Sequence, residues 1–121
     1  SITPVKPYEV SGKNDGDYAY NSARVPLRLA DSDNPKVEKV LNKMLLFFEK
    51  QPTVYGGYTL KGKPLVKNQS NSFSAPLLYA AKGHRNFSNL YASQRWIFDY
   101  SIVGKDYYGD TLKMLVLLKL Y

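Results

Sequence analysis

Residues 34–52 read NPKVEKVLNKMLLFFEKQP and carry the clearest helix signal in the chain. The side chain of Asn34, or of Asp33 before it, can cap a helix, and Pro35 suits the first helical turn. Apolar residues then recur at offsets of three and four, which predicts an amphipathic helix of about four turns ending near Gln51. These apolar residues are Val37, Val40, Leu41, Met44, Leu45 and Phe48.

Upstream of this helix, residues 1–16 contain two prolines and two glycines and are expected to form an extended lead-in. Asp15 or Asp17 could cap a further helix over about residues 18–30. Pro26 lies inside that stretch, so the helix should begin near the proline or be kinked there.

Downstream, residues 58–66 read YTLKGKPLV, and the glycine between two lysines predicts a short β-hairpin. Three further helices are expected: one capped by Ser74 with Pro76 in its first turn and ending at Lys82, one from Asn86 or Ser88 to about Tyr100, and one opened by Asp106. The fold class expected from this pattern is all-α, with about five helices plus a short β-hairpin.

The last helix is apolar on nearly every side, which is typical of a helix that is buried all round. Its apolar residues are Leu112, Met114, Leu115, Val116, Leu117, Leu118 and Leu120. Four short helices supply little cover for such a helix. We therefore expect residues 1–121 to form a single segment that belongs to something larger.

Composition excludes several classes of protein. The chain has 121 residues and no cysteine, which excludes a disulfide scaffold, a thiolate metal site and a cysteine nucleophile. One histidine, His84, is too few for a histidine-rich zinc site, and we predict neither a metal nor a cofactor. No apolar run reaches the roughly 18 residues of a transmembrane helix.

Two composition figures point to partners. The formal net charge of +7 raises a polyanion such as nucleic acid as a hypothesis, although lysines along residues 36–50 read more simply as a solvated helix face. Eleven tyrosines suggest an aromatic-lined, wet surface as well as a core.

The candidate binding residues lie in residues 17–28, DYAYNSARVPLR. On a helix, Tyr20 and Asn21 would lie four and three residues from Arg24, so all three could point to one side. An aromatic face, an amide and a guanidinium together suit a polyhydroxylated ligand, although an arginine buried beside core tyrosines fits equally well. Residues 106–110, DYYGD, open the last helix in the same way, so both helix starts could line one site.

Other candidate motifs favour structural roles. Gly56-Gly57 and residues 61–63 lack the spacing of a phosphate-binding loop and indicate turns. His84 reads as an exposed loop histidine. The acidic run near Asp15 lacks the remaining ligands of a calcium loop and favours helix capping.

The first of the two tyrosine motifs, Tyr20-Asn21-Ser22-Ala23-Arg24-Val25-Pro26-Leu27-Arg28, resembles a helix of glycoside hydrolase family 8. Residues 107–112, YYGDTL, are similar to the family's closing helix, and residues 73–78 to its intervening helix. The order of these motifs holds across residues 18–120.

The resemblance implies an (α/α)6 barrel of which this chain supplies the C-terminal portion. An N-terminal segment would complete the barrel and carry the glutamate that acts as general acid, so the chain alone should be inactive. The activity implied is inverting hydrolysis of a β-linked polysaccharide such as a β-1,4-glucan, xylan or chitosan. The setting implied is secretion or the cell surface of a bacterium, with no nucleic acid as partner.

The resemblance also assigns roles to residues. Asn21 aligns with the family's catalytic aspartate, and an amide cannot serve as the base that an inverting enzyme needs. Asp17 is the candidate substitute base if the protein is an enzyme. The first alternative is a non-catalytic glycan-binding homologue, and the second, which fewer features favour, is a basic helical nucleic-acid-binding domain. Tyr20 and Tyr108, or Tyr107, would line the central sugar subsite, with Arg24 beside the base position. Trp96 is either a sugar-stacking platform or a core residue.

Overall fold

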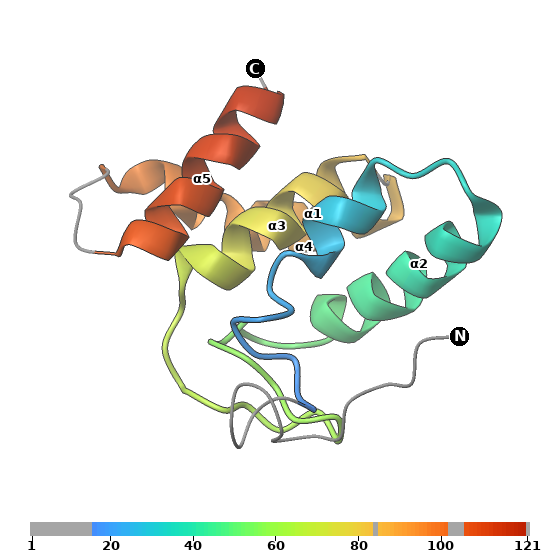
Figure 1. Cartoon of the computed structure of the whole chain (residues 1–121), viewed down its shortest axis with the longest axis horizontal. Coiled ribbons are helices and arrows are strands. Elements are labelled where there is room, and N and C mark those ends of the chain that lie inside the picture. Colours follow the sequence, from blue (N-terminus) through green and yellow to red (C-terminus); the bar gives the residue numbers. More distant parts are fainter. Residues whose placement is uncertain (1–15, 84, 102–105, 121) are drawn as a thin grey trace.

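The computed structural model describes residues 16–83, 85–101 and 106–120. Most of the expected lead-in, Asp15 and His84 therefore lie outside the described residues. The described chain is mostly helical, as the sequence predicts, with five α-helices arranged as in Figure 1. They are α1 (Val25–Ala30), α2 (Pro35–Glu49), α3 (Asn71–Lys82), α4 (Ser88–Gln94) and α5 (Tyr107–Leu120), with short 3-10 helices at Arg85–Phe87 and Arg95–Asp99.

Helix α3 is the centre of the fold and packs against α1, α4 and α5 (Figure 1). Nine of its twelve residues are buried. On one side Phe73 and Leu77 pack with residues of α2, among them Leu41 and Leu45. On the other side the core joins α3 to α5 and contains Ala75, Leu78, Ile97, Leu112 and Val116.

Helix α2 begins where the sequence predicts. The side chain of Asn34 accepts a hydrogen bond of 2.9 Å from the Lys36 backbone N–H, and Pro35 occupies the first turn. Leu41, Leu45 and Phe48 are buried. Val40 is 58% exposed, so the stripe inferred from apolar spacing is wider than the face that packs.

Helix α1 is shorter than expected, because residues 18–24 form turns and not helix. An isolated antiparallel bridge with Tyr58 holds Tyr18 in an extended position, with two backbone hydrogen bonds of 2.9 Å. Pro26 then lies in the first turn of the helix, where its missing N–H costs nothing. The prediction that Tyr20 and Arg24 share a helical face was therefore wrong.

Two boundaries in the C-terminal half also differ from expectation. Helix α3 starts after Ser70, whose side chain accepts from the Ser72 N–H at 3.2 Å, so Ser74 is no cap and Pro76 lies inside the helix. The expected helix to Tyr100 tightens at Arg95 into a 3-10 helix.

The predicted hairpin is not formed as a pair of strands. Tyr58 and Pro64 make an isolated antiparallel bridge, and the described residues contain no named strand. Gly62 takes a φ of +84° at the turn, a left-handed conformation that favours glycine.

Helix α5 buries one face and leaves another uncovered. Gly109, Leu112, Lys113 and Val116 are buried, and the Lys113 ammonium donates to the Tyr100 carbonyl. Met114, Leu115 and Leu118 are exposed, Leu118 by 70%. The described chain alone therefore does not bury this helix all round. None of the helices within the described ranges is both long and apolar enough to span a membrane.

Candidate functional site

The two tyrosine motifs meet in space. The Tyr108 hydroxyl donates a hydrogen bond of 3.1 Å to the Tyr20 carbonyl, although the residues lie 88 positions apart. Their rings stand edge to face with centroids 6.3 Å apart. The start of α5 and the turn before α1 thus form one continuous aromatic surface.

The turn that carries Tyr20 is held by its own hydrogen bonds. The Ala19 backbone N–H donates to Ser22 Oγ at 3.1 Å, and this hydroxyl in turn lies 3.3 Å from the Asp17 carbonyl and 3.1 Å from the Ala19 carbonyl. The buried ring of Phe73 lies 5.1 Å from the Tyr20 ring, centroid to centroid. Phe73 of α3 therefore supports Tyr20 from the protein side, while Tyr20 stays 54% exposed to solvent.

A groove of about 540 Å³ runs between α1 and α5 beside this aromatic surface. We call it the α1–α5 groove, and it is lined by Arg24, Leu27, Arg28, Asp31, Tyr108, Thr111, Leu112, Leu115 and Lys119. Three of the lining residues are cationic, while Asp31 is the one acid among them. The groove therefore combines guanidinium donors, one tyrosine and leucine side chains.

Asp31 is held ionised by its neighbours. Lys119 Nζ lies 2.7 Å from Asp31 Oδ2, and the Tyr79 hydroxyl donates to Asp31 Oδ1. These two hydrogen bonds lower the pKa of Asp31. The same contact with Asp31 raises the pKa of Tyr79 and that of Lys119. A carboxylate with a lowered pKa is a weak proton acceptor, so Asp31 is poorly suited to act as a general base.

The two candidate base positions lie outside the groove lining. Asp17 is half-buried, and its Oδ1 accepts from the Leu60 backbone N–H at 3.3 Å, which ties the turn to the 59–67 segment. Asn21 is exposed on the turn between Tyr20 and Arg24. Neither residue is among those that line the α1–α5 groove.

Trp96 and Tyr107 are placed apart from the groove. The Trp96 ring packs at the edge of the α3–α5 core, 6.0 Å from the Tyr100 ring between centroids, and lines a separate hollow with Arg95 and Phe98. Tyr107 is 85% exposed, and the groove lining includes Tyr108 instead. Of the two tyrosines considered, Tyr108 is therefore the one that joins the site.

The sequence analysis gave no role to two of the lining cations, Arg28 and Lys119. Arg28 lies four residues after Arg24 across the α1 start, so helical spacing could have found it. Lys119 comes from the other end of the chain and carries no local signal. Among the described residues, no group of three His, Cys, Asp or Glu side chains could hold a metal ion.

No family model, curated protein or solved structure matches the chain.

Proposed function

We propose that this chain forms the aromatic and cationic wall of a cleft for a β-linked polysaccharide, such as a β-1,4-glucan, xylan or chitosan. The chain would be the C-terminal part of an inverting, family 8-like glycoside hydrolase that is secreted or held at a bacterial cell surface. The observation that carries the proposal is the contact between Tyr20 and Tyr108, which joins the two motifs of the family resemblance beside one groove.

The groove has the chemistry that a sugar chain requires. The Tyr108 ring offers a flat face to sugar C–H groups, and the guanidinium groups of Arg24 and Arg28 offer several N–H donors to hydroxyl oxygens. Its volume of about 540 Å³ lies within the usual range of about 300–1,000 Å³ for ligand sites. A neutral sugar would bind there with little dependence on salt, unlike nucleic acid.

Hydrolysis would need residues from outside this chain. An inverting enzyme uses two carboxyl groups roughly 6.5–9.5 Å apart, one to protonate the leaving oxygen and one to activate water. Asp31 is engaged with Lys119 and Tyr79, so it supplies neither group. The general acid would come from an N-terminal segment that completes an (α/α)6 barrel and covers the exposed side of α5. Asp17 would be the substitute base only if its carboxylate broke the hydrogen bond that it accepts from the Leu60 backbone N–H.

A second candidate function is favoured by Asn21. With an amide at the aligned base position and Asp17 bound to the backbone, a non-catalytic glycan-binding homologue accounts for the same groove. The full-length protein with Asn21→Asp, assayed for reducing-end release, separates the two. Activity in the wild-type protein would indicate that a carboxylate elsewhere acts as base. Activity only in the Asn21→Asp variant would indicate a hydrolase that has lost its catalytic base. No activity in either protein favours the glycan-binding homologue.

Binding itself is tested by titration calorimetry of this chain with a β-1,4-linked hexasaccharide. Tyr108→Ala removes the ring and is expected to weaken binding about tenfold. Tyr107→Ala is the matched control, because it deletes the same side chain one residue away, outside the groove lining. Equal effects of the two substitutions would contradict the proposed site.

A further inference from the structure

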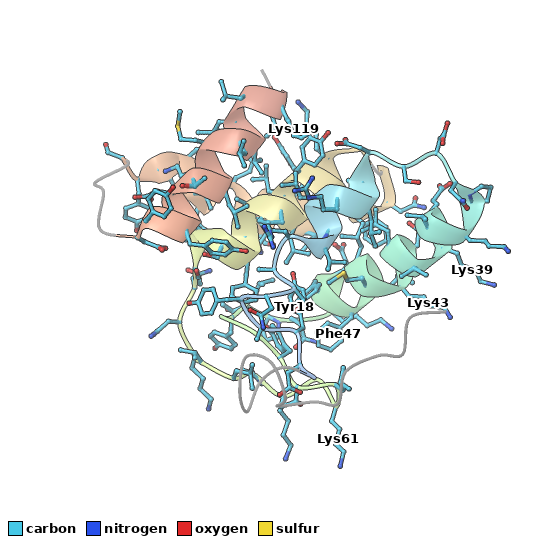
Figure 2. The ribbon with its side chains drawn as sticks, viewed as in Figure 1. Tyr18, Lys39, Lys43, Phe47, Lys61 and Lys119 are labelled. Atoms are coloured by element: carbon cyan, nitrogen blue, oxygen red, sulfur yellow. The ribbon has the colours of Figure 1, made fainter. Side chains whose placement is uncertain are left out.

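A second surface, the 59–67 loop, lies at the opposite end of the molecule from Lys119 (Figure 2). Figure 2 shows Lys61 pointing away from the helices at that end. Leu60 at the loop tip is 84% exposed, and Val66 is 47% exposed. Exposed lysines at positions 61, 63 and 67 lie close to these apolar side chains in the sequence.

Acidic residues are absent from the sequence around this loop. Residues 50–98 contain no Asp or Glu, whereas the lysines of α2 are interleaved with Glu38 and Glu49. In the folded chain, Asp17 reaches the loop and uses its Oδ1 to accept from the Leu60 backbone N–H. Among the described residues, the loop therefore presents three lysine charges, and Asp17 is the carboxylate that a hydrogen bond places at its base.

The loop is also held in one shape. The Thr59 N–H donates to the Lys63 carbonyl at 2.8 Å, and the Gly62 N–H donates to the Thr59 carbonyl at 2.9 Å. A Cβ added to Gly62 would lie 3.1 Å from the Phe47 ring, so the tip sits directly on α2. Holding the tip in this shape lowers the ordering entropy that docking would cost.

Beside the tip, an aromatic groove of about 500 Å³ opens between the loop and α2. Its lining includes Phe47, Tyr58, Leu60 and Lys61. Leu60 thus extends an apolar surface that reaches into the protein, and Lys61 lies at the edge of that surface.

We propose that the 59–67 loop docks the protein on an anionic lipid surface. Leu60 and Val66 enter the interfacial region, while Lys61, Lys63 and Lys67 contact the negatively charged headgroups. A soluble polyanion would engage the lysines but gain nothing from an exposed aliphatic tip, which is why the observations favour lipid. The proposal uses none of the residues that line the α1–α5 groove, and Lys61 and Lys119 lie at opposite ends of the view in Figure 2.

The test is co-sedimentation of the chain with vesicles of pure phosphatidylcholine and of phosphatidylcholine with about a third phosphatidylglycerol. Binding is expected only to the anionic vesicles, and it should weaken as salt rises. Each lysine charge that is removed should lower the vesicle affinity about fivefold. The triple variant Lys61→Gln, Lys63→Gln and Lys67→Gln should therefore bind about 100-fold more weakly. Leu60→Ala should weaken it about tenfold.

The matched control removes the same charge from α2, with Lys36→Gln, Lys39→Gln and Lys43→Gln together. Figure 2 shows Lys39 and Lys43 projecting from α2 and not from the loop. If this control loses little vesicle affinity, the result supports docking through the 59–67 loop. If it loses as much affinity as the loop variant, the result overturns the proposal. Unchanged binding of Leu60→Ala would indicate recognition of charge alone and would also overturn the proposal. All substituted side chains are exposed, and thermal unfolding of each variant checks that it is folded.

Discussion

Phe73 offers the sharpest test of how the candidate site is supported. Its side chain is fully buried in α3, and its ring centroid lies 5.5 Å from that of Tyr18 and 5.1 Å from that of Tyr20. Truncation by Phe73→Ala removes the apolar side chain, leaves a cavity and deletes both aromatic contacts. Substitutions of this kind cost about 3–5 kcal/mol, and the two lost ring contacts place the expected value near the upper end.

Urea unfolding followed by circular dichroism measures this loss. With an m-value of about 1–2 kcal/mol/M for a chain of this size, a loss of about 5 kcal/mol lowers the midpoint by about 2.5 M or more. Because the total stability of small domains is about 5–15 kcal/mol, Phe73→Leu provides a milder variant that stays folded. The matched control is Tyr107→Ala, an aromatic truncation at an 85% exposed position, with an expected effect below about 0.5 kcal/mol. A loss below about 1.5 kcal/mol for Phe73→Ala would refute this account of the packing.

Three further predictions concern single contacts. Tyr108→Phe deletes the 3.1 Å hydrogen bond to the Tyr20 carbonyl and should cost about 0.5–1.5 kcal/mol in urea unfolding; no loss would mean that the bond adds nothing. Gly62→Ala forces a side chain into a φ of +84° and should cost about 1 kcal/mol or more; an unchanged midpoint would contradict the turn geometry. The ion pair of Asp31 and Lys119 should stabilise the fold over a middle pH range, as stability runs at several pH values can show. The pKa of Asp31 is lowered in the folded chain, so its stabilising contribution is present above its unfolded pKa of about 3.9 and is lost as the pH falls. The pKa of Lys119 is raised, so its contribution is present below its unfolded pKa of about 10.4 and is lost as the pH rises. If Asp31→Asn leaves the acid limb of the stability profile unchanged, the pair has no such role.

The parts of the fold that depend on local chemistry could be predicted from the sequence. The start of α2 is set by Asn34 and Pro35, and the cap of α5 is Asp106, whose Oδ1 accepts from the Gly109 N–H at 3.1 Å. Each of these signals acts within a few residues, so no knowledge of distant packing was needed.

Other parts depend on contacts between distant residues and could not be predicted. Residues 18–24 leave the helix because Tyr18 pairs with Tyr58, forty positions away, and no local rule reveals such a bridge. The apolar composition of α5 likewise does not say which side packs within this chain, where Leu112 and Val116 are buried and Leu118 is exposed. Sequence reasoning proposed a shared site for Tyr20 and Tyr108 from their similar surroundings, although the helical geometry assumed for Tyr20 was wrong.

Chemical-shift mapping of the chain with a β-1,4-linked hexasaccharide tests the central claim most directly. The account predicts that backbone amide signals move most at residues 24–28 and 108–115, on the two sides of the α1–α5 groove, and that the midpoint of the titration stays the same when salt is raised. Largest shifts at the hollow beside Trp96, or no shifts at millimolar sugar, would contradict it.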